Sequence, residues 1–204
     1  MATQDHWRRV YSSKAPDTVS WYQPSPRQSL DLIQQAGLSR DAHILDVGGG
    51  ASFLVDELLD AGFHDVSVLD VAEEPMDIVR RRLGERAAGV EWISADITGF
   101  RPDRQWDLWH DRAVFHFLVD EEARAGYRCA LSGGLAPGGH VVVATFGPDG
   151  PPKCSGLPVE RYDAAGLEAA LGCDLALQAS FLHDHQTPGG GMQQFLHCRF
   201  VRQE

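Results

Sequence analysis

The chain has 204 residues, of which 43% are hydrophobic and 23% charged, and its formal net charge is −11 at pH 7. This length suits one domain with a full hydrophobic core, and the composition is that of a globular protein. The negative charge disfavours binding to nucleic acid or to an anionic membrane, because both require a basic surface. It is compatible with a cationic ligand.

The lack of a recognisable targeting signal and the spacing of the cysteines lead us to expect a cytoplasmic protein. The N-terminal segment MATQDHWRRVYSSK lacks the apolar stretch of a secretory signal, and no apolar run is long enough to span a bilayer. The cysteines are widely spaced and form no CxxC pair, which favours reduced thiols over a disulfide framework or a zinc site. They are Cys129, Cys154, Cys173 and Cys198.

The N-terminal part combines two helical patterns, Gln4 to Ser13 and Pro26 to Ala36, with the irregular stretch KAPDTVSWYQPSP between them. Aromatic side chains gather here without a helical stripe, so they either anchor the helices or form a lid over a ligand, and we favour a lid. These side chains are Trp7, Tyr11, Trp21 and Tyr22.

Strand-like and helix-like stretches alternate through the middle of the chain. We expect strands at 43–47, 66–69, 90–93, 106–109 and 140–146, and helices at 52–61, 75–83 and 121–131. This alternation predicts an α/β protein with a parallel, doubly wound sheet and right-handed crossovers. After a Pro-rich loop at 147–158, we expect a helix at 163–171 and two antiparallel strands at 175–182 and 194–201.

The first strand ends in three consecutive glycines, Gly48 to Gly50. A dinucleotide fingerprint would need a further glycine where Phe53 stands, so a pyrophosphate is disfavoured, and the lysine of a P-loop is missing. Three glycines in a row cost backbone entropy on folding, which favours a turn that approaches a ligand over a bare turn.

Two carboxylates follow the next two strands. Asp70 ends the second strand, where a carboxylate commonly holds ribose hydroxyls, and Asp96 with Ile97 ends the third, where the pair can grip an adenine. Each aspartate is also compatible with a helix-capping role. Ribose and adenine without phosphates, in an acidic cleft, suggest S-adenosylmethionine (SAM).

The ordered set ILDVGGGAS, VSVLDVAEEPM, WISADIT, WDLWHDRAVFHFL and LAPGGHVVVATF resembles the class I SAM-dependent methyltransferases. The resemblance implies a Rossmann-like, seven-stranded sheet, mostly parallel, with a C-terminal antiparallel hairpin. It also implies one domain over 1–204, with an N-terminal helical lid at 1–38. The cofactor-binding core is then 39–146, and a loop, helix and hairpin at 147–204 complete the sheet.

The resemblance further implies the residues that bind the cofactor. The glycine turn lies under the methionine part of SAM, the aspartate of the second strand binds ribose, and the third strand supplies the adenine contacts. The implied set is Trp7, Tyr11, Asp46, Gly48, Gly50, Ser52, Asp70, Val71, Asp96, Ile97 and His110.

The segment after the fourth strand carries the candidate catalytic residues. Ligands of open α/β sheets lie outside the carboxyl ends of the strands, so we expect this rim to face the cofactor or the acceptor. His110 or His116 could act as a general base, because imidazole titrates near neutral pH. Asp111 and Arg112 are further candidates, and their alternative role is a local ion pair that orients the loop.

Candidate acceptor contacts are Trp21, Tyr22, Phe115 and Cys154, although Phe115 also suits the core and Cys154 also suits loop packing. His183 and His185 lie on one side of a strand, but no third metal ligand is evident, so we expect no metal.

We expect methyl transfer to a nitrogen, sulfur or oxygen atom of a small molecule, with S-adenosylhomocysteine (SAH) as the product. A protein-lysine methyltransferase is the alternative, because HWRRVY and SWY resemble the elongation-factor type of lysine methyltransferase. That type carries Asp-Lys-Gly-Thr after the fourth strand, whereas this chain has Asp-Arg-Ala-Val. A non-catalytic SAM-binding module and an NAD-dependent oxidoreductase are further alternatives.

Overall fold

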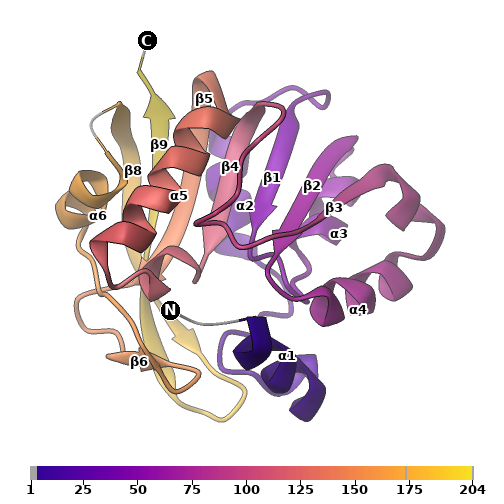
Figure 1. Cartoon of the computed structure of the whole chain (residues 1–204), viewed down its shortest axis with the longest axis vertical. Coiled ribbons are helices and arrows are strands. Elements are labelled where there is room, and N and C mark those ends of the chain that lie inside the picture. The colour runs from indigo at the N-terminus through magenta and orange to yellow at the C-terminus, as the bar shows by residue number, and fades with distance from the viewer. Residues whose placement is uncertain (1–3, 173, 204) are drawn as a thin grey trace.

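A seven-stranded sheet with the order β3-β2-β1-β4-β5-β9-β8 forms the centre of the protein (Figure 1). The computed structural model describes residues 4–172 and 174–203. The strands from β1 to β5 are parallel, and β9 runs antiparallel to both β5 and β8. The Rossmann-like fold with a C-terminal hairpin is therefore confirmed. The strands are β1 (His43–Val47), β2 (Asp65–Asp70), β3 (Val90–Ser94), β4 (Trp106–Arg112), β5 (Leu135–Phe146), β8 (Leu175–Gln186) and β9 (Met192–Arg202).

Helices cover both faces of the sheet and the edge where the parallel strands end. They are α1 (Gln4–Ser13), α2 (Arg27–Gln35), α3 (Leu54–Asp60), α4 (Glu73–Leu83), α5 (Glu121–Gly134) and α6 (Ala164–Leu171), with 3₁₀ turns at Pro16–Thr18, Gly84–Gly89 and Phe115–Phe117. The carboxylates of Asp120 and Asp163 accept backbone N–H groups at the starts of α5 and α6. α1 lies beside α4, below the ends of the central strands in Figure 1.

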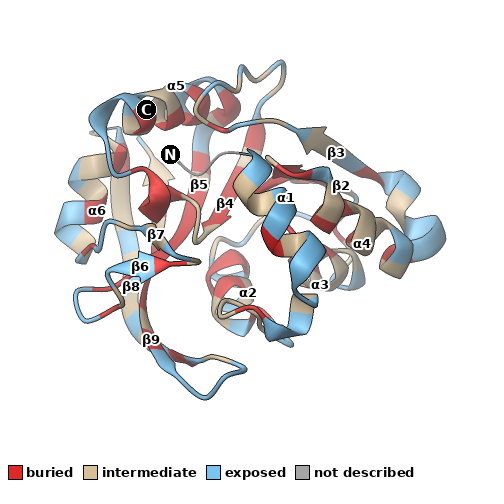
Figure 2. Ribbon diagram, turned by 60° about the horizontal axis from the view of Figure 1, so that its bottom comes forward, coloured by how far each residue is buried: buried red, intermediate tan, exposed pale blue. Residues whose placement is uncertain are grey.

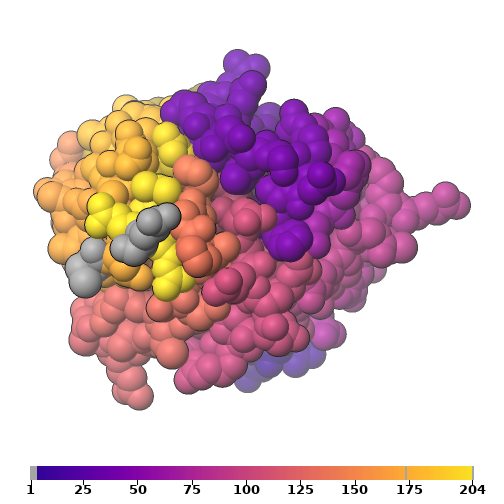
Figure 3. Space-filling view, turned by 90° about the horizontal axis from the view of Figure 1, so that it is seen from above, coloured from indigo at the N-terminus to yellow at the C-terminus, as the bar shows by residue number. Residues whose placement is uncertain are grey.

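Two apolar cores sandwich the sheet, because a parallel sheet must be covered on both faces. Leu108 belongs to the core under α2, α3 and α4, whereas its neighbour Trp109 belongs to the core under α5 and α6. Figure 2 shows the buried residues concentrated on the central strands. In Figure 3, the early part of the chain in purple adjoins the C-terminal part in orange and yellow, in agreement with the contact between α2 and β9.

Several strands are longer than the sequence pattern predicts. β4 continues through His110, Asp111 and Arg112, which we expected on a rim outside the strand. The extension follows from its central place in the sheet, because Asp111 pairs with Val47 of β1 and Arg112 with Ala144 of β5. Neighbours on both sides satisfy the backbone, so polar side chains do not end the strand.

The C-terminal hairpin and the loop before it also differ from the prediction. β8 runs to Gln186 and β9 begins at Met192, so both strands extend into the segment predicted as a turn, and residues 187–191 connect them. The Pro-rich loop after β5 contains a small hairpin of β6 (Lys153–Cys154) and β7 (Leu157–Pro158). These strands depend on cross-strand partners, which a local sequence pattern does not reveal.

Cys129, Cys154 and Cys198 are free thiols, and Cys129 is exposed, whereas Cys173 lies outside the described residues. Within the described part of the chain, no helix has the length and apolar character needed to cross a membrane.

Candidate functional site

The turn after β1 requires glycine for two physical reasons. Gly48 and Gly50 adopt φ angles of +66° and +51°, a region that side chains with a Cβ rarely enter. A Cβ on Gly50 would lie 2.7 Å from the Tyr11 hydroxyl, and one on Gly49 would lie 2.7 Å from Asp46 Oδ2. The turn therefore brings bare backbone close to the N-terminal helix and to the end of β1.

Two carboxylates lie beyond this turn, at the ends of neighbouring strands. Asp70 is 7% exposed, and its Oδ1 accepts the N–H of Ala72 at 2.9 Å. Burial raises the pKa of the Asp70 carboxyl to about 7. Asp96 is exposed, and its Oδ1 accepts the backbone N–H and the hydroxyl of Thr98 at 2.9 and 2.8 Å. Each aspartate thus organises its own turn and still borders the cleft.

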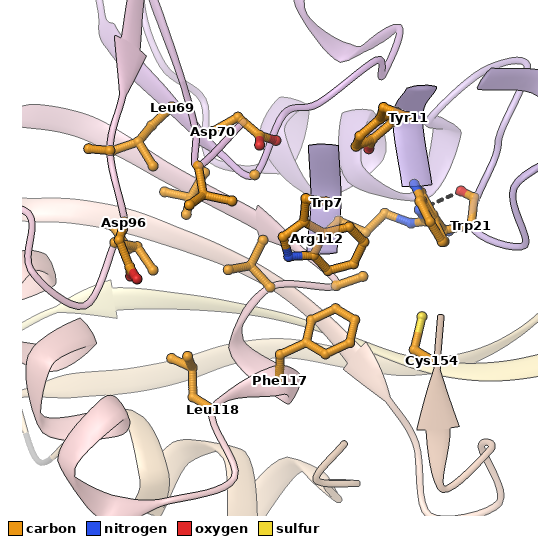
Figure 4. A pocket seen from close by; sticks show the side chains of 17 residues that line it. Trp7, Tyr11, Trp21, Leu69, Asp70, Asp96, Arg112, Phe117, Leu118 and Cys154 are labelled. Atoms are coloured by element: carbon orange, nitrogen blue, oxygen red, sulfur yellow. Dashed lines mark hydrogen bonds between the residues drawn. The ribbon is translucent and has the colours of Figure 1, made fainter. Parts of the chain in front are cut away.

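A cleft of about 840 Å³, including its open mouth, lies above the carboxyl ends of β1, β2 and β4. One part is lined by Val47, Asp70, Val71, Asp96, Ile97 and Leu118, and another by Trp7, Tyr11, Trp21, Arg112, Phe117 and Cys154. Figure 4 shows Asp96 on one side of the cleft, and Trp21 and Cys154 on the other.

A second, smaller cavity of about 600 Å³ adjoins the cleft. It is lined by Tyr22, Gln23, Asp46, Ser52 and His110, among others. Tyr11, Trp21, Gly48 and Arg112 line both cavities, so these residues stand at the junction.

The helix α1 covers the cleft with aromatic side chains. The Trp7 ring meets the Trp21 and Phe117 rings edge-on, with centroids 5.8 and 5.2 Å away. Outside the cleft, Arg8 Nε donates to Glu74 Oε1 of α4 at 2.8 Å. Burial and the nearby Asp70 carboxylate raise the pKa of Tyr11. Trp7 and Tyr11 therefore line the cleft from the side of α1.

His110 is held by hydrogen bonds at both ring nitrogens. Nδ1 lies 2.7 Å from Asp46 Oδ1, and Nε2 lies 2.8 Å from the hydroxyl of Ser29 in α2. The ring is 3% exposed, although it borders the smaller cavity. This chain of contacts joins α2, β1 and β4 beneath the glycine turn.

Asp111 and Arg112 are adjacent on β4, and they do not form the local ion pair considered above. Adjacent strand residues project to opposite faces of a sheet, which separates the two side chains. The Asp111 carboxylate is buried and accepts the backbone N–H groups of Val114 and Phe115 at 3.0 and 3.2 Å. Burial raises the pKa of Asp111 to about 6. Asp111 therefore holds the turn after β4 and lines neither cavity.

Two further predicted site residues lie away from both cavities. His116 is fully buried, and its Nδ1 accepts the N–H of Phe146 at 3.3 Å. Burial, helped by the charge of Arg112, lowers the pKa of His116 to about 3. Phe115 packs in the core against Tyr127, because the 3₁₀ turn Phe115–Phe117 directs it toward α5.

Cys154 borders the larger cavity, and burial raises the pKa of its thiol to about 11. His185 Nε2 lies 2.9 Å from the carbonyl oxygen of Ser20, and His183 Nε2 lies 3.2 Å from Gln28 Nε2. Among residues 4–172 and 174–203, no group of three or more His, Cys, Asp or Glu side chains is arranged to hold a metal.

Ser29 and Leu118 are site residues that the sequence analysis missed. Ser29 is a buried polar residue, and it shares the apolar face of α2 with Leu32 and Ile33. A hydroxyl at helical spacing from two apolar residues was a usable signal. Leu118 follows a short 3₁₀ turn and carried no comparable signal.

The fold and the site define a class of protein with an open α/β sheet and a cleft at the carboxyl ends of its strands, where such folds bind their ligands. Residues 44–139 match a family model described as "Methyltransferase domain". Together with the sheet order, this match relates residues 44–139 to the class I SAM-dependent methyltransferases, a family that uses SAM as its cofactor.

The similar proteins include a bacterial nodulation protein and animal methyltransferases that act on a protein. Nodulation protein S of Rhizobium tropici is 31% identical over 147 residues, which cover 70% of this chain and 60% of that protein. The eEF1A lysine and N-terminal methyltransferase of Mus musculus is 23% identical over 120 residues, which cover 58% of this chain. This chain spans only 17–21% of the length of the eEF1A relatives that it matches.

A solved structure supports the fold over almost the whole chain. The N-methyltransferase NodS from Bradyrhizobium japonicum WM9, in complex with SAH, superposes with a TM-score of 0.72 at 18% identity. The match covers 96% of this chain and 98% of that one.

Proposed function

We propose that this protein transfers a methyl group from SAM to a nitrogen, sulfur or oxygen atom of a small molecule. The observation that carries the proposal is the meeting of the glycine turn, Asp70 and Asp96 around one cleft beneath α1. Arg112 is the one side chain with a fixed positive charge among the lining residues, so a phosphate-rich cofactor would lack partners. A nucleoside with a sulfonium charge fits the carboxylates.

The cofactor contacts follow from the chemistry of the lining. Ribose hydroxyls would donate to the Asp70 carboxylate, and the adenine amino group would donate to Asp96. Val71 and Ile97 offer apolar surface to the two faces of the base. The Asp46–His110–Ser29 contacts hold the end of β1 rigid where the methionine part would lie. Bound SAM supplies an activated methyl group, so the protein needs no covalent catalysis.

The chain's own contribution is to orient the acceptor and to exclude water. The aromatic side chains of α1 and Trp21 cover the junction of the two cavities, where the acceptor atom and the methyl group would meet. Such enclosure holds the reactants in line and prevents side reactions. It also supports a small acceptor, which can enter the cleft entirely.

A general base is needed only for acceptors that must lose a proton before attack. His110 is bonded at both ring nitrogens, and His116 is buried outside the cavities. The geometry therefore favours a positioning role for His110. Tyr22 and Trp21, which border the smaller cavity, are the proposed acceptor contacts together with Cys154 of the larger one.

Protein-lysine methylation is the second candidate, because the eEF1A methyltransferases are among the matched relatives. One experiment separates the candidates: incubating the protein and methyl-labelled SAM with a cell lysate and then fractionating by size. We expect the label in a small molecule other than SAM, separated from SAM by chromatography, and less of this product with Asp70→Asn. Label confined to macromolecules would reject a small acceptor.

Two controls address the remaining alternatives. Tight binding of SAM without any SAH formation would indicate a non-catalytic module, and calorimetric binding of NAD in place of SAM would indicate an oxidoreductase. The exposed free thiol of Cys129 supports a cytoplasmic address, because such thiols persist in reducing compartments. Cell fractionation of the tagged protein tests this address.

A further inference from the structure

Arg112 is a half-buried cation without a counter-ion among the residues that the structure describes. Its Nη1 donates to the carbonyl oxygen of Trp21 at 2.8 Å, and its guanidinium lies 4.7 Å from the centre of the Phe195 ring. Within residues 4–172 and 174–203, no carboxylate forms an ion pair with it. Burial lowers the pKa of Arg112 to about 10, so the group is still charged at neutral pH. Burying a charge without a partner is strongly unfavourable.

Two hydrogen-bond donors of Arg112, Nε and Nη2, have no partner, and both atoms are shielded from solvent. These atoms share one edge of the planar guanidinium. That edge matches a carboxylate, which accepts two parallel hydrogen bonds. In a desolvated setting such charge-assisted bonds are stronger than in water.

Arg112 lies where the two cavities meet, which is where the acceptor would bind. Arg112 lines both cavities, and Figure 4 shows its side chain extending toward Trp21, away from Asp96. The next residue, Ala113, has a φ angle of +67°, a conformation unusual for a residue with a side chain. Such backbone strain is commonly held at functional sites. The Cys154 thiol nearby is neutral, because burial raises its pKa to about 11, so it supplies no counter-charge.

We propose that the Nε–Nη2 edge of Arg112 binds a carboxylate of the acceptor, so that the acceptor is a small organic acid. The inference rests on the proposed function and assigns its substrate class. The carboxylates at the ends of β2 and β3 serve the cationic cofactor, and the guanidinium at the end of β4 serves an anionic acceptor. Arg112 is thereby a specificity-determining residue.

The test uses formate and acetate as probes, since neither ion has a scaffold that could clash with the cleft. Calorimetry measures their binding to the SAH-saturated protein, with formamide and acetamide as uncharged counterparts. We expect both ions to bind at least about tenfold more tightly than the amides. Arg112→Met should abolish this preference, and Arg112→Lys should keep part of it.

Arg161→Met is the matched control, because Arg161 Nη1 also donates to backbone carbonyl oxygens, those of Pro148 and Gly150, but lines neither cavity. It should leave anion binding unchanged. Equal binding of ions and amides, or an unchanged preference in Arg112→Met, would overturn the proposal.

A second source of a carboxylate is the methionine end of the cofactor, and a further comparison separates it from the acceptor. SAH carries this carboxylate, whereas 5′-methylthioadenosine lacks it. We expect Arg112→Met to bind both nucleosides as the wild-type protein does. Weaker binding of SAH alone would assign the guanidinium to the cofactor and reject the acceptor role. Failure of the wild-type protein to bind either nucleoside would instead reject the proposed function.

Discussion

At the scale of single residues, burial changes the chemistry that the sequence suggests. Asp70 keeps its backbone contacts at the end of β2, yet its carboxyl lies under α1, and desolvation moves its pKa from the acidic range to about 7. His110 has no free ring nitrogen, because Asp46 and Ser29 bind both. Each of these environments leads to a measurable consequence.

Asp70 should couple cofactor binding to pH. Ribose hydroxyls donate to the ionised carboxylate, so affinity should be full above about pH 8 and fall by about tenfold per pH unit below a pKa of about 7. Complex formation at pH 7 should release protons, which calorimetry in buffers of different ionisation enthalpy detects. Asp70→Asn should weaken SAH binding by roughly 10- to 150-fold and remove this pH dependence. A pH-independent wild-type affinity between pH 6 and 8 would contradict the assignment.

His110→Ala separates a positioning role from a general-base role. Removing the ring leaves the buried Asp46 carboxylate without its partner, so we expect a stability loss of about 1–3 kcal/mol in urea unfolding and weaker SAH binding. Ser29→Ala, the milder control, should act in the same direction with a smaller effect. Turnover at saturating substrate that collapses in His110→Ala, while stability and SAH affinity stay normal, would indicate a general base after all. His116→Ala should leave the pH–rate profile unchanged.

At the scale of elements, the cleft is assembled from pieces that are far apart in the chain. The turn after β1, the ends of β2 and β3, and the final residues of β4 meet because parallel strands end at one edge of the sheet. α1 then covers that edge through Trp7, which contacts Trp21 and Phe117. The lid is held mainly by this aromatic contact, since the Arg8–Glu74 ion pair is exposed.

Trp7→Ala should loosen α1. Truncating a half-buried tryptophan should cost about 2 kcal/mol and lower the Tm by roughly 4–8 °C. Trypsin should then cleave sooner at Arg8, Arg9 and Lys14, and SAH should bind more weakly. Glu74→Gln, which breaks the exposed ion pair and leaves the tryptic sites intact, should change these rates much less. A larger effect from Glu74→Gln than from Trp7→Ala would show that the ion pair holds the helix.

At the scale of the whole molecule, charge sets how the ligands approach. The net charge of −11 creates a negative potential around the protein. SAM carries a sulfonium charge that SAH lacks, so the field should attract SAM only. An acidic acceptor would approach against this field, which makes the fixed charge of Arg112 at the junction more important for holding it.

Salt should therefore slow the association of SAM more than that of SAH. Raising the ionic strength from roughly 10 to 150 mM shortens the screening length from about 30 to about 8 Å. We expect the association rate of SAM to fall several-fold over this range, while that of SAH changes little. Stopped-flow tryptophan fluorescence measures both rates. An identical salt dependence for the two ligands would contradict electrostatic steering.

The sequence by itself determined the class of the fold and the strand-end residues that border the cleft. Alternating hydrophobic patterns, the glycines after His43–Val47 and the aspartates after the next two strands are local features, and local features follow from chain stereochemistry and periodicity. The ordered set of motifs then indicated a resemblance to the class I SAM-dependent methyltransferases.

The tertiary structure alone decided what each polar side chain after the fourth strand does. The sequence placed His110, Arg112 and His116 together on one rim. However, β1 and β5 extend the strand through the first two, and the 3₁₀ turn after β4 buries the third in the core. The direction of a side chain and the partner of a buried charge depend on neighbours distant in sequence. For that reason the contact between Ser29 and His110 and the unpaired edge of Arg112 became visible only once the elements were packed.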